Sequence, residues 1–235
     1  MSLFFRRLRF LLALILVLLL AAYSLSGLGY FEWPRDYDPL ALPDLNAAPN
    51  LLTPFKLKRI DSSAENCRAA FARAGKTVGI EPARTDTAQC VKEGTIKLAS
   101  LSTAKLNVEE TRCAIAARLF MWEYNVVQPA ARKYFNEPVT EILHFGSYSC
   151  RNIRGSSATS EHATANAFDI SGFRLRSGKL ISLKQEWQGN QPQAKYLREV
   201  RDAACDYFNV VLSPDYNADH HDHLHVDMGW YRTCR

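Results

Sequence analysis

The sequence predicts an α+β fold in which an antiparallel sheet carries a polar site and helices pack behind it. Three observations favour this class. Alternating strand patterns occur near the C-terminus, apolar residues recur at helical spacing in the middle of the chain, and six cysteines are spread widely. Roughly 170 residues are available for this fold, which is enough for one domain with its own core.

The first 31 residues are predicted to be a signal-anchor transmembrane helix. Three arginines, Arg6, Arg7 and Arg9, precede an uncharged stretch that runs from residue 10 to residue 31. A helix of about 20 apolar residues crosses a bilayer, and flanking arginines keep its N-terminus in the cytoplasm. The remainder of the chain would then be exported.

An aromatic collar favours the uncleaved anchor. Tyr30, Phe31 and Trp33 stand where such a helix would leave the membrane, and aromatic side chains prefer that interface. A cleaved signal peptide is the alternative, because Ala22-Tyr23-Ser24 is a small-x-small site after an apolar region of suitable length.

Residues 32–62 are predicted to form an extended tether. This range contains prolines that interrupt any regular pattern, namely Pro34, Pro39, Pro43, Pro49 and Pro54. The folded domain is then expected to cover residues 63–235.

Within that domain, apolar spacing predicts three helices and four strands. The middle helix has a core stripe and is expected to end before Pro129. The expected helices are 64–74, 109–127 and 193–208, and the expected strands are 139–145, 167–173, 209–212 and one that begins near residue 223.

The charge balance argues against nucleic acid as a partner. The net charge of the chain is +5, and the three N-terminal arginines supply +3 of it, so residues 32–235 carry +2. Nucleic-acid binding requires a dense basic surface, and no basic stripe interleaved with aromatic residues is present in the sequence.

The cysteines predict three disulfides and therefore an oxidising compartment. They are even in number and lack a Cys-x-x-Cys pair, which argues against a thiolate metal site. Six cysteines allow fifteen pairings. The pairing expected here is Cys67 with Cys90, Cys113 with Cys150, and Cys205 with Cys234.

Four of the six histidines lie in one run near the C-terminus, from Asp219 to Asp227. At the strand period of two, His223, His225 and Asp227 share one face. Leu224, Val226 and Met228 occupy the other face. This pattern predicts a strand that packs on a core and carries polar ligands on its opposite side.

A second polar cluster lies about 60 residues upstream and contains His162 and Asp169. Phe168 and Ile170 share a core-facing side of a predicted strand, so Asp169 points the other way. Small residues at positions 163–166 form a loop able to fold His162 back toward Asp169. Two imidazoles and one carboxylate, from His162, Asp169 and His225, are the protein ligands of an open catalytic zinc site. The set points toward hydrolysis.

The remaining histidines have different expectations. His223 lies two residues from His225 and is placed to act beside the metal as a base or as a stabiliser of an oxyanion. His144 is expected to be an ordinary packed histidine, and His220 and His221 are expected to form a polar turn before the strand.

The residues also resemble a known family. From about Cys67 onward the chain is similar to the extensin-like C-terminal domain family of bacteria, through segments that include Gly146-Ser147-Tyr148-Ser149-Cys150-Arg151, Ser160-Glu161-His162-Ala163, Asn166-Ala167-Phe168-Asp169-Ile170-Ser171-Gly172-Phe173, Leu212-Ser213-Pro214-Asp215-Tyr216-Asn217 and His223-Leu224-His225-Val226-Asp227. That family in turn resembles the zinc D-alanyl-D-alanine carboxypeptidases, the murein endopeptidase and the lysostaphin-type peptidases. Their shared signature is a histidine, an aspartate seven positions later, and then His-x-His.

The resemblance implies specific roles and a location. His162, Asp169 and His225 would bind zinc, His223 would assist catalysis, and Arg151 would lie near the substrate. The substrate would be the peptide part of peptidoglycan, and the domain would lie in the periplasm or other extracytoplasmic space, held at the inner (cytoplasmic) membrane by the N-terminal helix. The family often has glycine near position 165, where this chain has Ala165.

The sequence therefore predicts an exported, membrane-tethered zinc peptidase. Three alternatives stay open at this point. Arg151 can instead be tied to nearby backbone carbonyls. The domain can be a non-catalytic wall-binding module whose structural zinc is closed by Asp227 or His220. The run 219–227 can be a loose metal-binding cluster, against which the separate His162 and Asp169 argue.

Overall fold

The computed structural model describes residues 2–235, apart from the side chains of Ser2 and Glu109. It divides into two units, one ending at Ala41 and the other beginning at Leu42.

The first unit holds the predicted N-terminal helix. Helix α1 (Ser2–Gly27) is followed by a short 3-10 turn, η1 (Arg35–Tyr37). The stretch Leu3–Gly27 is long and apolar enough to cross a membrane, and it is the one such helix among the described residues. This is consistent with a single-pass topology, although a signal sequence has the same properties.

The second unit contains all remaining elements. Its helical segments are α2 (Thr53–Asp61), α3 (Ala64–Arg73), α4 (Cys113–Trp122), the π-helical turn η2 (Glu123–Val127), α5 (Gln128–Phe135), the 3-10 turn η3 (Glu161–Thr164), α6 (Leu183–Glu186), α7 (Pro192–Ala204) and the 3-10 turn η4 (Ala218–His220). Its strands are β1 (Gly79–Ile80), β2 (Arg84–Thr87), β3 (Cys90–Lys92), β4 (Thr95–Ser100), β5 (Lys105–Arg112), β6 (Val139–Gly146), β7 (Ala167–Leu175), β8 (Leu180–Ser182), β9 (Val210–Leu212), β10 (Leu224–Asp227) and β11 (Thr233–Cys234).

Nine of the strands in the described chain form one twisted sheet. Its order is β1-β4-β5-β6-β7-β10-β9-β11, and β8 pairs with β7 outside this path. Neighbouring strands are antiparallel except for β5 with β6 and β9 with β11. Strands β2 and β3 form a separate hairpin. The α+β class with a mostly antiparallel sheet is therefore confirmed.

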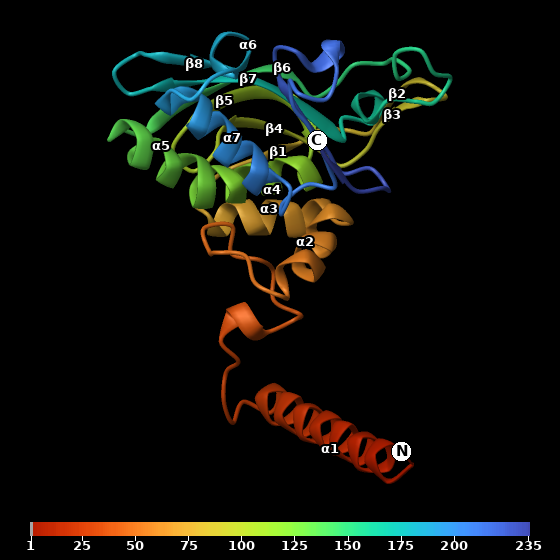
Figure 1. The fold of residues 1–235 in the computed structure, drawn as a ribbon. Coiled ribbons are helices and arrows are strands. Elements are labelled where there is room, and N and C mark those ends of the chain that lie inside the picture. Colours follow the sequence, from red (N-terminus) through yellow and green to blue (C-terminus); the bar gives the residue numbers. More distant parts are fainter. Residues whose placement is uncertain (1) are drawn as a thin grey trace. The chain divides into compact units, whose positions relative to one another are not determined.

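Helices α4, α5 and α7 cover one face of the sheet (Figure 1). The core lies between these layers. Trp122 of α4 packs against Phe173 of β7 with ring centroids 6.1 Å apart, and Tyr196 of α7 approaches the same ring at 5.4 Å. Phe168 and Ile170 are fully buried, as their alternation in the sequence predicts. The opposite face of β7, which carries Asp169, is the one left for the polar site.

The fold corrects both ends of the predicted middle helix. The middle helix begins at Cys113 rather than at residue 109, because Lys105–Arg112 is strand β5 and pairs with β4. Pro129 does not end the helix, because it falls in the first turn of α5, where a missing N–H costs nothing. The π-helical turn η2 separates α4 from that new start.

Residues 42–62, about two thirds of the predicted tether, belong to the compact unit. Leu45 is fully buried, and Leu57 and Ile60 of α2 face the core. An apolar stripe at helical spacing accounts for this packing, and Pro54 sits in the first turn of α2, where proline is tolerated. The expected extended segment is thus limited to residues that precede the compact unit.

Three disulfides join all six cysteines of the described chain. The pair Cys205–Cys234 is as expected. The other two expected pairs are wrong, because Cys67 bonds Cys113 and Cys90 bonds Cys150. Helix α3 packs on α4, which brings Cys67 to Cys113 and leaves Cys90 on the β2–β3 hairpin to reach Cys150.

Candidate metal centre

Two paired strands bring the predicted ligands together. In the antiparallel pairing of β10 with β7, His225 lies directly opposite Asp169. Both residues are on the sheet face away from the buried Leu224, Val226 and Ile170. Directly opposed residues share one side of an antiparallel pair, so the register alone brings an imidazole and a carboxylate into contact.

The third ligand reaches the same point from the turn η3. The hydroxyl of Ser160 caps this turn by accepting a hydrogen bond from the His162 N–H at 3.3 Å. The chain then reverses at Ala165, which has a left-handed backbone with φ 54°. This reversal carries the chain directly into β7 and Asp169, as the small residues of the loop predict.

His162, Asp169 and His225 form the one group of three metal-ligating side chains found among the described residues with atoms within 4.8 Å of one another. His162 Nε2 lies 3.1 Å from Asp169 Oδ2 and 3.2 Å from His225 Nδ1. His225 Nδ1 lies 2.9 Å from Asp169 Oδ1. A tetrahedral zinc site with bonds of 2.0–2.1 Å has ligand-to-ligand edges of about 3.3 Å, so the spacing suits that ion.

The outer nitrogen of each imidazole is already used as a donor. His162 Nδ1 lies 2.8 Å from the carbonyl oxygen of Ser147, which can only accept, so Nδ1 carries the proton. His225 Nε2 lies 3.0 Å from Asp227 Oδ2 and donates to that carboxylate. His162 Nε2 and His225 Nδ1 therefore face the same point as the Asp169 carboxylate, and in the neutral imidazoles these two nitrogens carry the lone pairs.

Three acceptors that converge in this way require a cation or a proton between them. Burial would lower the pKa of His225, but its hydrogen bonds to Asp169 and Asp227 raise that pKa to about 9 when only a proton is available. Burial would raise the pKa of Asp169, but hydrogen bonds from His162 and His225 hold it well below its usual range. The donor set and its outer partners fit a zinc ion, because metal-bound histidines commonly donate their second nitrogen to a carboxylate or a carbonyl.

His223 lies beside the three ligands without joining them. Its Nε2 is 3.6 Å from Asp169 Oδ1, and its Nδ1 is 2.9 Å from Asp222 Oδ1. Burial would raise the pKa of Asp222, but the hydrogen bond from His223 lowers it, so Asp222 is an ionised acceptor at neutral pH. This pairing leaves His223 Nε2 as the free atom that faces the cluster.

Two further residues, His220 and Ser147, complete the immediate surroundings. His220, expected to be part of a polar turn, has its ring centroid 5.2 Å from that of His223 and 5.9 Å from that of His225. Burial and the charges of His225 and His223 lower its pKa to about 4. Ser147 supplies the carbonyl that orients His162. The 3.6-residue and two-residue periods carry no signal for a backbone acceptor, which is why Ser147 was missed.

A cleft of about 820 Å³ opens at the cluster. His223, His225 and Asp169 form part of its wall, and Arg151 forms another part. The exposed guanidinium of Arg151 has no hydrogen-bond partner among the residues that the structure describes. The expected position near the site is therefore observed, whereas a tie to backbone carbonyls is not.

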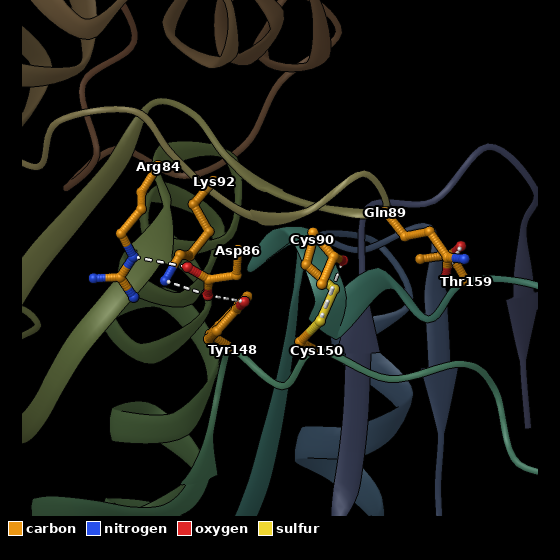
Figure 2. Close-up of a disulfide and its surroundings, with 9 residues drawn as sticks. Arg84, Asp86, Gln89, Cys90, Lys92, Tyr148, Cys150 and Thr159 are labelled. Carbon is orange, nitrogen blue, oxygen red and sulfur yellow. Dashed lines mark hydrogen bonds and ion pairs between the residues drawn. A yellow bond between two sulfur atoms is a disulfide. The ribbon is translucent and has the colours of Figure 1, made fainter.

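The segment before Arg151 is fastened to the β2–β3 hairpin (Figure 2). The Cys90–Cys150 disulfide joins the two, and the Tyr148 hydroxyl donates to Asp86. Lys92, whose side chain is fully buried, lies 3.9 Å from the centre of the Tyr148 ring. The same segment bonds the site directly, because Ser149 N–H donates to the His162 carbonyl at 3.0 Å.

His144 is an ordinary packed histidine, as expected. Its Nε2 lies 2.5 Å from the carbonyl oxygen of Leu106, and its ring packs on Phe168 at 4.8 Å. His221 is exposed and bonds the carbonyl of Ala218, so it is part of a polar turn.

Comparison with known proteins places the compact unit in a family. No curated protein and no solved structure gives a significant match to the chain. Residues 65–235 match the family described as "Extensin-like protein C-terminus", and this match covers more than half of the chain. The region includes all three ligand candidates, His223 and Arg151, so the site described above lies wholly within it. The chain belongs to the extensin-like C-terminal family.

Proposed function

We propose that the protein is an exported, membrane-tethered zinc peptidase that hydrolyses the peptide part of bacterial peptidoglycan. The observation that carries the proposal is the convergence of two histidine nitrogens and one carboxylate, from His162, His225 and Asp169, on one point at the wall of a cleft.

The ligand set favours a catalytic zinc over a structural one. Catalytic zinc sites use three protein ligands and leave a position open, whereas structural sites are closed by four. Asp227 accepts a hydrogen bond from His225 Nε2, the nitrogen that faces away from the cluster, and so acts as an outer partner. The cleft gives the remaining side of the cluster access to a substrate.

The order of the residues supports the choice of peptide substrate. His162 and Asp169 are seven positions apart, and His223-Leu224-His225 follows. This order resembles the signature of the zinc D-alanyl-D-alanine carboxypeptidases, murein endopeptidases and lysostaphin-type peptidases. Because those peptidases act on the cell wall, we propose cell-wall peptides as the substrate. A mildly basic exported domain tolerates the anionic polymers of the wall.

Each side chain at the cleft has a proposed role. A zinc ion held by His162, Asp169 and His225 would supply Lewis-acid chemistry, polarising a carbonyl and lowering the pKa of a water to about 7. His223 Nε2, oriented by the bond from Nδ1 to Asp222, would move a proton or stabilise developing negative charge. Arg151 would hold a carboxylate of the substrate.

The N-terminal helix and the three disulfides support the location. A single apolar helix next to Arg6, Arg7 and Arg9 would keep the N-terminus in the cytoplasm. Three disulfides require an oxidising compartment on the other side. We therefore propose the inner membrane as the anchor and the periplasm, or an equivalent space, as the site of action.

The test uses the full chain in detergent with purified peptidoglycan, followed by mass analysis of released fragments. The wild type should release peptide fragments, and a chelator should abolish release. His223→Ala should retain its zinc but lose about 10²–10⁴-fold in turnover, the range of a positioned acid or base. A wild type that releases nothing while it holds zinc would sink the peptidase proposal.

A wall-binding module with a structural zinc is the second candidate. One observation favours it: the His220 ring lies 5.9 Å from that of His225, close enough for a modest movement to supply a fourth ligand. In that case His220→Ala should weaken zinc binding as strongly as His162→Ala. In a peptidase with an open site, His220→Ala should leave the zinc content unchanged.

A further inference from the structure

The wall of the cleft carries an unusually exposed tryptophan. Trp230 is 93% exposed, more than any other large apolar side chain of the described chain. An isolated exposed apolar residue needs no explanation, but Trp230 is not isolated. Tyr231, Tyr216 and Ile153 line the same cleft and are 44%, 48% and 46% exposed.

The tryptophan stands on a fixed base. Trp230 packs edge-to-face with Tyr231 at 5.6 Å between ring centroids. The Asn209 side chain donates to the Gly229 carbonyl at 2.6 Å, and the Thr233 N–H donates to the Asn209 carbonyl at 3.0 Å. The next residue after Thr233 is tied to α7 through the Cys205–Cys234 disulfide. These bonds hold the backbone that carries the aromatic pair, so that ligand binding need not order the loop.

The same base is built against the metal cluster. The carboxylate of Asp227 accepts from His225 through one oxygen and from the Gly229 N–H through the other, at 3.0 Å and 2.7 Å. A Cβ atom at Gly229 would lie 3.0 Å from both Asp227 Oδ1 and Glu161 Oε1. Glycine at position 229 therefore allows the loop to lie close to Asp227 and Glu161. The Asp227 carboxylate bonds both His225 and this loop, so it fixes the position of the loop relative to the proposed metal.

Polar side chains line the same cleft as the aromatic ones. Arg154 and Asp219 form an ion pair at 2.5 Å, and both line the cleft together with Asn152 and Asn217. A flat apolar face bordered by charged groups and amides complements a sugar ring, which has an apolar C–H face and hydroxyl groups around its edge. An extended peptide presents no such flat face. The volume of about 820 Å³ lies in the upper part of the range of about 300–1,000 Å³ that ligand sites have, which leaves room for a sugar ring beside a peptide.

We propose that Trp230, with Tyr231 and Tyr216, forms a saccharide subsite that binds a sugar ring of the glycan strand to which the peptide substrate is attached. This inference rests on the proposed function and narrows its substrate class to glycan-linked peptides. The subsite binds through stacking and edge hydrogen bonds and does not require the metal.

The first test measures binding without turnover. The full chain in detergent is titrated by calorimetry with a tetramer of N-acetylglucosamine, with and without chelator. Trp230→Ala should weaken binding on the order of tenfold, and Trp230→Phe should recover most of it, because a ring face is restored. Tyr124→Ala removes an aromatic side chain that is 44% exposed, as Tyr231 is, but lies outside the cleft, and it should change nothing. A wild type that does not bind the tetramer, or a Trp230→Ala variant that binds as tightly as wild type, overturns the subsite.

The second test separates the subsite from the peptidase. Hydrolysis is compared for a free stem peptide and for the same peptide carried on its disaccharide. Trp230→Ala should raise KM for the disaccharide-linked peptide on the order of tenfold, leave its kcat unchanged, and leave the free peptide unaffected. Equal losses on both substrates would overturn the subsite while the peptidase stands. Tetramer binding that depends on Trp230, without hydrolysis of either substrate, would support the subsite and overturn the peptidase.

Discussion

The compact unit contains two polar clusters, and they differ in whether a protein cation balances their carboxylates. In the first, the buried Lys92 ammonium lies 3.0 Å from Glu110 and 3.3 Å from Asp86, and the hydroxyl of Tyr148 donates to Asp86. This cluster holds its own cation. In the second, His162, Asp169 and His225 turn three acceptors toward one point, and the described chain places no lysine or arginine there.

The difference distinguishes a structural cluster from a candidate functional one. Every group around Lys92 has a partner, and the pKa changes follow from those bonds: the Tyr148 hydrogen bond lowers the pKa of Asp86, and the same bond raises the pKa of Tyr148 to about 12. The histidine cluster is satisfied only when a proton or a metal ion joins it. Its side chains bond one another, with His225 2.9 Å from Asp169 and 3.0 Å from Asp227, so the cluster needs a proton on His225 or a metal ion in its place.

The largest expected effect is on metal affinity. His225→Ala and His162→Ala each remove one of three ligands. Each should weaken zinc binding on the order of 10³-fold, because each ligand contributes part of the large binding free energy of a zinc site. His221→Ala is the matched control, because that histidine is exposed and bonds only near its own turn. Zinc titration of the refolded, chelator-treated proteins measures the change. If both ligand variants bound zinc as tightly as wild type, the histidine cluster would not be a metal site.

The next effect concerns the pH dependence of the metal-free protein. The raised pKa of His225, about 9, means that its proton contributes stability fully below about pH 6.5, and that this contribution is lost as the pH rises through 9. The loss is at most about 3 kcal/mol. Asp169, with a lowered pKa, contributes in the opposite sense, because its stabilisation is present above about pH 4 and is lost as the pH falls further.

Urea unfolding in chelator at pH 6 and pH 9.5 measures this change in the free energy of unfolding. The His225→Ala protein supplies the control, since it lacks the titrating group. Zinc should reverse the trend, because metal binding requires unprotonated ligands and strengthens as the pH rises. Equal stability of the chelated wild type at both pH values would mean that no proton completes the cluster.

A smaller effect is expected at the cluster around Lys92. Lys92→Met removes the buried cation and leaves the exposed Arg84, 3.1 Å from Asp86 and 3.9 Å from Glu110, as the remaining cation. Breaking a buried pair costs several kcal/mol, but these carboxylates are 34% and 20% exposed, so a loss of about 2 kcal/mol is expected. Zinc affinity should not change. Lys97→Met, at an exposed pair with Glu81, should cost well under about 1 kcal/mol. A loss of zinc in Lys92→Met would show that the two clusters are coupled.

The sequence predicted the histidine cluster better than the structure around it. The strand period placed Asp169 and His225 on the face away from Phe168 and Val226, and the pairing of β7 with β10 agrees. Period-two patterns and ligand types are local, so they can be recognised without tertiary contacts. The same reasoning placed His162 in a reversing loop, which η3 and Ala165 provide.

Long-range features were predicted poorly. The strands between residues 79 and 112 were missed, because β4 and β5 contain bulges that break the alternation and Asn107 has a positive φ. Two disulfide pairs were wrong, since pairing depends on helix packing rather than on order along the chain. Trp230 carries no sequence signal for the cleft, because its place depends on how separate loops meet. His220 was expected only as part of a polar turn or as the residue that closes a structural zinc site.

The smallest expected effect tests the turn that carries His162 to Asp169. Ala165 is fully buried and has φ 54°, a conformation that costs alanine about 1–2 kcal/mol and glycine nothing. Ala165→Gly gains this amount but loses a buried methyl and adds freedom to the unfolded chain, so its stability should stay within about 1 kcal/mol of wild type. Ala117→Gly makes the same change at a fully buried position inside α4. There the backbone is helical, so the change relieves no strain and only loses the buried methyl and the helix propensity of alanine, which should cost about 2 kcal/mol. Chemical denaturation of the two variants gives the difference directly. Equal costs would mean that the backbone at Ala165 is not strained, and zinc affinity in Ala165→Gly should match wild type because the ligands keep their positions.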